Sequence, residues 1–269
     1  MSVSHTVPRP VRAVLNRRGA LAALALLAVS GCGGSEPSGS RATDPHWDYD
    51  AEGPDHWADL DSHYVTCRSG HAQSPIDLPG HSQLHPTDHI EIDYRPIPSA
   101  ELVNNGHTIQ ANVPAGNRIL VDGKPFALTQ FHFHLPSEHT VDGADATMEL
   151  HFVHADSNGR PAVLAVLLRA QEGGSPFDAV LATPPDHPGA TRSIGRIDPR
   201  RFLPDDLAQF RYQGSLTTPP CTEGVEWIVL SHPVPVAVTE ADRFRALFPH
   251  SNRPTQPRYG RPVILAGPR

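Results

Sequence analysis

The segment Gln130-Phe131-His132-Phe133-His134 indicates both how this chain folds and what it holds. Alternate residues of a β-strand face the same side of a sheet, so His132 and His134 present two imidazoles together while the phenylalanines pack on the opposite face. A second strand carrying His151, in Glu149-Leu150-His151, can supply a third imidazole across the ladder. Because three neutral imidazoles and one open position form a catalytic zinc site, the spacing predicts such a site here.

Short strand-like segments dominate the chain around this pair of histidines. Residues 148–153 alternate apolar and polar side chains, whereas residues 162–168 form a continuous apolar run typical of a fully buried strand. Turn signals at Asn105-Gly106 and Asp122-Gly123 mark changes of direction between strands. Further strands are expected at residues 90–94, 102–103, 107–111, 119–121 and 225–230.

Helical patterns are few and short, near residues 177–181 and 239–248. The 29 prolines also argue against long helices, because proline lacks the amide hydrogen that a helix interior needs. We therefore predict a mainly β fold: a single domain built on a large, mostly antiparallel twisted sheet with short peripheral helices.

Composition narrows the class of protein further. With 269 residues, 38% hydrophobic and 19% charged, the chain is an ordinary globular protein in composition. Its net charge is −7 and its body carries no basic stripe. We therefore expect no nucleic-acid partner.

The N-terminus has the pattern of an export signal. Four arginines precede an apolar run at residues 20–29 that is too short to span a bilayer and ends in small residues. Val29-Ser30-Gly31-Cys32 resembles a bacterial lipobox, in which the cysteine is lipidated. We expect a lipoprotein-type signal peptide at 1–31, a flexible tether at 32–44 and one domain at 45–269. The alternative is plain secretion with a free Cys32, and Arg17-Arg18 leaves the export route, Sec or twin-arginine, open.

The three cysteines fit this interpretation. If Cys32 carries lipid, Cys67 and Cys221 remain, and an oxidising compartment favours pairing them. The alternative is two buried thiols.

The pattern His-x-His-x3-Glu also opens the metal motif of cupins, which would make Glu138 a metal ligand. A cupin needs a downstream Pro-x-Gly-x2-His segment. The region of His151 contains no such segment, and no later histidine has that context. The cupin alternative is therefore disfavoured.

The motifs together resemble those of the α-class carbonic anhydrases, and more closely the bacterial, exported branch than the animal one. The resemblance runs from about His46 to the C-terminus. The segments that carry it, in the family's order, are His46-Trp47-Asp48-Tyr49, Gly53-Pro54-Asp55-His56-Trp57, Gln73-Ser74-Pro75-Ile76, Asn104-Asn105-Gly106-His107, Gln130 to His134, Ser137 to Gly143, Glu149-Leu150-His151 and Gly214 to Cys221.

The resemblance implies a role for each site residue. His132, His134 and His151 would hold zinc, and Gln130 and Glu149 would be the hydrogen-bond partners of His132 and His151. Thr217 would accept a hydrogen bond from the attacking hydroxide and donate its own proton to Glu138, which aims the nucleophile at the substrate. Cys67 and Cys221 occupy the positions of the family's disulfide.

Two further groups of residues are implied by the resemblance. An apolar wall for an uncharged linear substrate would consist of Val153, Val163, Leu216, Thr218, Val225 and Trp227. His107 would export the proton, since a histidine titrates near neutral pH, and Tyr49, Asn105 and Gln110 would order the connecting water.

The implied activity is the zinc-dependent, reversible hydration of carbon dioxide to bicarbonate and a proton. The expected partners are these small molecules and, through the lipid anchor alone, the outer face of a bacterial membrane. Without the anchor, the protein would be periplasmic or extracellular. The alternative function is that of a carbonic-anhydrase-like surface protein that binds zinc without significant hydration.

Overall fold

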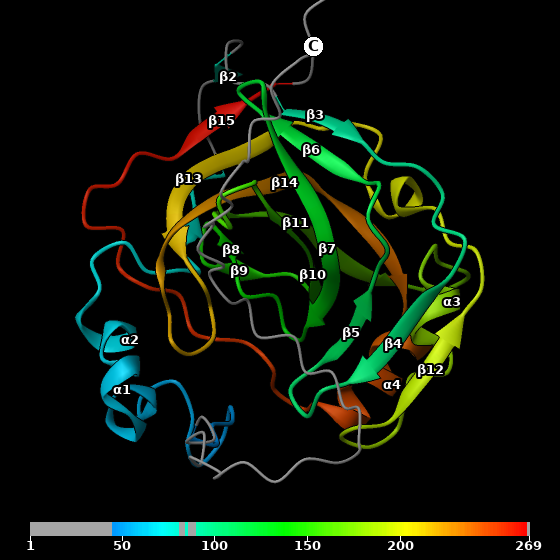
Figure 1. Cartoon of the computed structure of the whole chain (residues 1–269), viewed down its shortest axis with the longest axis horizontal. Coiled ribbons are helices and arrows are strands. Elements are labelled where there is room, and N and C mark those ends of the chain that lie inside the picture. The colour runs from blue at the N-terminus through cyan, green and yellow to red at the C-terminus, as the bar shows by residue number, and fades with distance from the viewer. Residues whose placement is uncertain (1–44, 81–83, 86–89, 268–269) are drawn as a thin grey trace, which may run out of the picture. The chain divides into compact units, whose positions relative to one another are not determined.

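The computed structural model describes residues 45–80, 84–85 and 90–267 of the chain (Figure 1). The expected signal peptide, the tether and the lipidated Cys32 lie outside the described residues. Within the described part, no helix is both long and apolar enough to cross a membrane.

One large mixed sheet organises the described residues (Figure 1). Its strands are, in spatial order, β12 (Thr191–Ile194), β4 (Ala100–Asn104), β5 (Ile109–Asn112), β7 (Lys124–His134), β10 (Met148–Ala155), β11 (Pro161–Gln171), β14 (Glu223–Ala237), β13 (Gln209–Ser215), β15 (Ile264–Ala266) and β2 (Leu84–His85). On one side, β3 (Ile90–Asp93) pairs with β6 (Arg118–Val121), which pairs with β7. The pairs β11–β14 and β15–β2 are parallel, and the other pairs in this sheet are antiparallel. The prediction of a mainly β fold on a large, mostly antiparallel sheet is confirmed.

A small second sheet and short helices lie around the large sheet. The small sheet consists of β1 (Asp77–Leu78), β8 (Thr140–Val141) and β9 (Ala144–Asp145). Two expected helices form, as α3 (Asp178–Leu181) and α4 (Val238–Leu247). Four short helical segments were not expected: α1 (Trp57–Leu60), η1 (Ser62–Tyr64), α2 (Thr66–Ser69) and η2 (Pro199–Phe202). Each is too short to show a helical period in the sequence.

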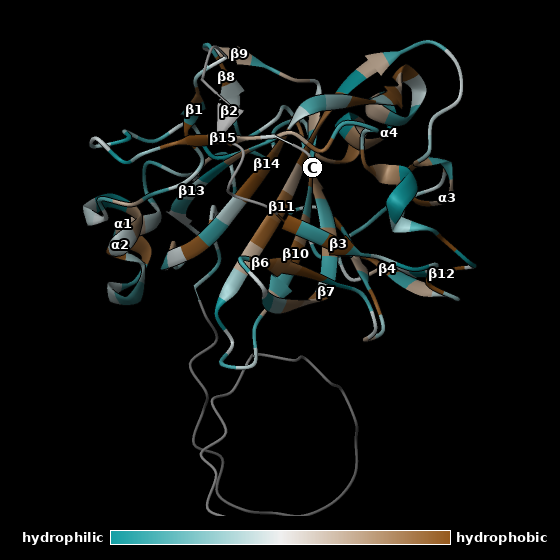
Figure 2. Ribbon diagram, turned by 90° about the horizontal axis from the view of Figure 1, so that it is seen from above, coloured by the Kyte–Doolittle hydropathy of each residue, from teal (hydrophilic) through white to brown (hydrophobic). Residues whose placement is uncertain are grey.

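The two faces of the sheet bury different cores, as the alternation of β7 predicts. Phe131 and Phe133 join a large apolar cluster, to which α3 and α4 contribute Val180 and Phe244. The face that carries the histidines borders a second cluster, which includes Trp227. The apolar run at residues 162–168 forms the middle of β11. Figure 2 shows hydrophobic residues along β11 and the neighbouring β14.

A disulfide joins Cys67 in α2 to Cys221, and the Cα atoms of the two cysteines are 5.0 Å apart. The predicted pairing is confirmed, and the alternative of two buried thiols is wrong. The bridge connects the helical N-terminal segment of the described residues to the turn that follows β13.

Candidate metal centre and active site

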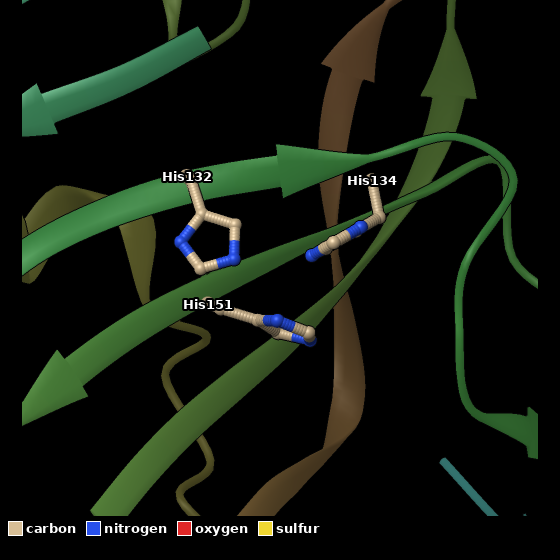
Figure 3. A group of neighbouring side chains, drawn as sticks. All are labelled: His132, His134 and His151. Atoms are coloured by element: carbon tan, nitrogen blue, oxygen red, sulfur yellow. The ribbon is translucent and has the colours of Figure 1, made fainter. Parts of the chain in front are cut away.

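Three imidazoles converge on one face of β7 and β10 (Figure 3). His132 lies opposite His151 in the antiparallel register, and His134 is two residues further along β7. One ring nitrogen from each of the three histidines lies within 4.8 Å of the other two. His134 and His151 are buried, whereas His132 is partly exposed. The structure thus brings together the three predicted ligands.

Hydrogen bonds to the outer nitrogen define the tautomer of each ring. Nδ1 of His132 lies 2.8 Å from Oε1 of Gln130, Nδ1 of His134 lies 2.5 Å from the carbonyl oxygen of Ser251, and Nε2 of His151 lies 2.8 Å from Oε1 of Glu149. These oxygens only accept, so the outer nitrogens carry the protons. Nε2 of His132, Nε2 of His134 and Nδ1 of His151 therefore keep lone pairs for a metal.

The three ring nitrogens that keep lone pairs, called the inner nitrogens here, can bind a metal ion. Nε2 of His134 is buried, and no described residue makes a hydrogen bond to it. Such an orphaned buried acceptor is costly unless something occupies it. Burial and the other two imidazoles also hold the pKa of His132 well below its usual value, and burial lowers the pKa of His134. Both rings are therefore neutral near pH 7, as metal binding requires.

Glu149 is fully buried and accepts four hydrogen bonds. Its Oε2 accepts from the backbone amides of Glu138 and His139, and its Oε1 accepts from ring nitrogens of His139 and His151. Burial alone would raise the pKa of Glu149, but these two histidines outweigh it and hold the pKa well below its usual value. The ionised carboxylate therefore orients His151 in the manner of a metal-site partner.

His139 was missed as a site residue in the sequence, where it reads only as part of a motif. Its Nε2 lies 2.7 Å from the hydroxyl of Tyr212, which in turn lies 2.8 Å from Oγ of Ser74. Since Nδ1 donates to Glu149, Nε2 must accept from Tyr212, and Ser74 donates to Tyr212. No sequence signal identifies these partners, because Ser74 and Tyr212 are 138 residues apart.

Glu138 and Thr217 are both buried, and Glu138 lies beside the metal centre. Oε1 of Glu138 accepts from the backbone amide of Arg253 at 2.9 Å and lies 3.6 Å from Nδ1 of His134. Oε2 of Glu138 is buried and no described residue donates to it. The hydrogen bond expected from Thr217 to Glu138 is therefore not formed here, although the open acceptor it would use is present.

The residues of the expected apolar wall lie on three neighbouring strands and the turn after β13. Val153 faces Val163 across β10 and β11, and Val163 pairs with Trp227 on β14. The ring of Trp227 lies 5.0 Å from that of His151. Val163, Val225 and Trp227 are buried in one cluster against which Val153 and Leu216 pack, and Thr218 is half-buried in the turn. The wall therefore borders the metal centre.

His107 is half-buried in the turn between β4 and β5, and this turn together with Trp47 and Tyr49 is called the rim below. Its ring stacks on Trp47, with centroids 3.8 Å apart and planes 6° apart. Burial and the nearby His46 lower the pKa of His107, while Asp48 raises it. Trp47 was part of a quoted motif but was not assigned a role. Because Trp47 and His107 are 60 residues apart in the sequence, no local pattern predicts this contact.

The residues expected to order water lie near His107, and some of their polar groups form hydrogen bonds within the protein. Oδ1 of Asn105 accepts from the amides of His107 and Thr108. Gln110 lies opposite His132 in the register of β5 and β7, and its Nε2 donates to Asn112. The ring of Tyr49 lies 6.5 Å from that of His107.

The chain matches a family model described as eukaryotic-type carbonic anhydrase over residues 52–266. It is 43% identical over 226 residues to a carbonic anhydrase of Klebsiella pneumoniae, covering 81% of this chain and 90% of that protein. It is 39% identical to a carbonic anhydrase of Neisseria gonorrhoeae over 81% of this chain and 87% of that protein.

Solved structures give the same result. The α-carbonic anhydrase of Thermovibrio ammonificans, solved with the inhibitor sulfanilamide, superposes with a TM-score of 0.76 at 42% identity. That match covers 82% of this chain and 99% of the other.

Proposed function

The chain belongs to the eukaryotic-type (α-class) carbonic anhydrase family, and we propose that it performs the family's reaction at zinc held by His132, His134 and His151. The reaction is the reversible hydration of carbon dioxide to bicarbonate and a proton. The observation that carries the assignment is the set of three inward lone pairs, one of them on a buried nitrogen that has no hydrogen-bond partner in the described part of the chain. Bound zinc lowers the pKa of a coordinated water to about 7, a value established for carbonic anhydrase itself, and so supplies a nucleophile at neutral pH.

The chain's own residues hold the ligands in one arrangement. Gln130, Ser251 and Glu149 fix the tautomers of His132, His134 and His151, so no change of tautomer is needed when the metal binds. The buried apolar wall around Trp227 suits carbon dioxide, which carries no charge, and excludes bulk water from the reacting atoms.

Thr217 and Glu138 orient the nucleophile in this proposal. Oε2 of Glu138, to which no described residue donates, would be the acceptor for the hydroxyl proton of Thr217. Once that proton is committed, Oγ1 of Thr217 can only accept, and it fixes the direction of the nucleophile's lone pair. This positioning lowers the entropic part of the barrier.

His107 carries the proton from the site to solvent. Its lowered pKa keeps the ring neutral, and therefore able to accept a proton, at and somewhat below neutral pH. Tyr49, Asn105 and Gln110 would order the water that connects it to the metal centre.

Stopped-flow hydration assays test the assignment. Purified protein should hydrate carbon dioxide, lose the activity with a zinc chelator and regain it with added zinc. Activity that a chelator does not affect would contradict a metal-dependent reaction.

The alternative of a zinc-binding surface protein without hydration is not favoured, since relatives named carbonic anhydrase match most of the chain. Thr217→Ala separates the two functions. If the variant binds zinc and the hydration rate is unchanged, Thr217 has no catalytic role.

The chain is also proposed to be exported and anchored by lipid at Cys32 to the outer face of a bacterial membrane. The support is the arginine-rich, apolar N-terminal sequence ending in the lipobox-like residues 29–32, together with the Cys67–Cys221 disulfide, which an oxidising compartment favours. Mass spectrometry of the membrane fraction should find an acylated N-terminal Cys32. A soluble product cleaved elsewhere would refute the anchor.

A further inference from the structure

The segment of residues 251–253, which follows α4, touches the metal centre at two points. The carbonyl oxygen of Ser251 accepts from Nδ1 of His134 at 2.5 Å, and the amide of Arg253 donates to Oε1 of Glu138 at 2.9 Å. Ser251 also exchanges hydrogen bonds with both backbone groups of Leu135. The position of this segment therefore determines the orientation of one ligand and of the carboxylate expected to serve Thr217.

The side chain of Arg253 connects this segment by hydrogen bonds to residues that are distant in the sequence. Arg253 is 1% exposed, and its Nη1 donates to Oε1 of Gln73 and to the carbonyl of Ser74, both at 2.8 Å. Its Nη2 donates to the carbonyl of Cys67 at 2.6 Å. Nε2 of Gln73 in turn donates to the carbonyl of Cys221 at 3.1 Å. The guanidinium is thus bonded to one half-cystine directly and to the other through Gln73.

The burial of this guanidinium calls for a physical reason. Among the described residues, it forms no ion pair with a carboxylate and its Nε has no hydrogen-bond partner, while its Cζ lies 5.8 Å from the centroid of the Trp57 ring. Burial lowers the pKa of Arg253 to about 10, against the opposing effect of Glu138. A buried cation without a contacting anion is expensive, and the attraction of the Trp57 ring for the guanidinium offsets only part of this cost. Its three hydrogen bonds to fixed acceptors are a geometric function that an apolar side chain cannot perform.

We propose that Arg253 is a positioning residue for the metal centre: its buried guanidinium fastens residues 251–253 to the region of the Cys67–Cys221 disulfide and so holds His134 and Glu138 in place. The inference deepens the proposed function, since it assumes that the three histidines bind zinc. It adds a link between the disulfide and the metal centre that runs through Gln73, Arg253 and Ser251.

Zinc affinity, measured by competition with a chelator, tests the proposal without relying on activity. Arg253→Met should raise the Kd for zinc about tenfold, as loss of an outer-shell support does in other zinc sites. Arg211→Met is the matched control. Arg211 is also buried, makes three hydrogen bonds and leaves its Nε unpartnered, but it binds Asp122 and Glu226.

The control should change the Kd for zinc less than twofold, even if both variants lower the melting temperature. Equal Kd values for Arg253→Met and the parent, or an equal rise in both variants, would overturn the proposal. Absence of zinc binding by the parent would instead refute the proposed function, so the two failures are distinguishable.

A second variant covers the case in which Arg253→Met does not fold. Arg253→Lys keeps the charge but offers one nitrogen in place of two, so it cannot reach all three acceptors. We expect a folded protein whose Kd for zinc is about threefold higher. An unchanged Kd in this variant contradicts a geometric role.

Kinetics separate positioning from simple loss of folded protein. In weak buffer, export of the proton through His107 limits kcat, whereas kcat/KM reports the hydration step. Arg253→Lys, saturated with zinc, should lower kcat/KM severalfold and leave kcat in weak buffer nearly unchanged. An equal fall of both would mean fewer active molecules and would contradict the proposal.

A double-mutant cycle tests the link to the disulfide. Replacing both Cys67 and Cys221 by serine should raise the Kd for zinc in the parent and add little in the Arg253→Lys background, because both changes loosen the same connection. Fully additive effects would show that the disulfide and Arg253 act independently, which contradicts the proposed link.

Discussion

The metal centre and the rim of the active site hold their histidines in opposite ways. At the centre, each of His132, His134 and His151 has its outer nitrogen fixed by an oxygen 2.5 to 2.8 Å away. At the rim, the ring of His107 makes ring contacts, stacking on Trp47 and lying edge-on to Tyr49, and no described residue makes a hydrogen bond to it.

The difference matches the two tasks. A metal ligand must present one lone pair in one direction, so a fixed tautomer and a buried ring are an advantage. A proton carrier must accept on one nitrogen and release from the other, and a locked tautomer would prevent this. The same residue type therefore performs two functions because its hydrogen-bond partners differ.

Removing a fixed histidine should have the largest effect. His134→Ala deletes one of three ligands, and losing the several kcal/mol that a catalytic metal supplies corresponds to a roughly 1000-fold fall in kcat/KM for hydration. Stopped-flow kinetics and a metal assay on the purified variant check this. His232→Ala, at an exposed histidine of β14 outside the metal centre, serves as the control, and a comparable loss there would contradict the assignment of the ligands.

Removing the rim histidine should act on a different step. His107→Ala should lower kcat in weak buffer on the order of 100-fold, the lower end of what a positioned proton-transfer group contributes, and leave kcat/KM nearly unchanged. Added imidazole should restore much of kcat. If the variant equals the parent in weak buffer, another group exports the proton.

Thr217 acts at the metal centre in the proposed mechanism, and its replacement should lower kcat/KM less than the replacement of a metal ligand. A hydrogen bond to a charged group contributes about 1.5 to 3 kcal/mol, so Thr217→Ala should lower kcat/KM roughly 10- to 100-fold while zinc content stays constant. Thr217→Ser keeps the hydroxyl and should retain most of the rate. Equal losses in the alanine and serine variants would mean that the hydroxyl is not the active group.

Trp47→Ala should give the smallest effect, a shift in the pH dependence of kcat through the pKa of His107. Burial lowers the pKa of His107, and part of that burial comes from the stacked indole. Exposing the ring should raise its pKa towards the usual value, so the pH midpoint for kcat in weak buffer should move upward. NMR titration of His107 measures the pKa directly, and a downward or absent shift would show that Trp47 does not contribute.

The sequence predicted the parts of the site that depend on local geometry. The two-residue period of β7 placed His132 and His134 on one face, and the buried run at 162–168 became the middle of β11. Helix α4 lies within one residue of its expected bounds.

The remainder depends on contacts between distant segments. Ser251 and His134 are 117 residues apart, and Arg253 and Cys67 are 186 apart, so no local pattern reveals either bond. The short helices α1 and α2 contain four residues each and show no helical period. The export signal and the lipid anchor remain predictions.

Anomalous diffraction at the zinc edge, from a crystal of zinc-loaded protein, locates the metal ion and identifies its ligands. We expect one ion bound at about 2.0–2.1 Å by Nε2 of His132, Nε2 of His134 and Nδ1 of His151. An ion held instead by another group, such as His46, Asp48 and Glu52, with the three central imidazoles unligated, would contradict this expectation.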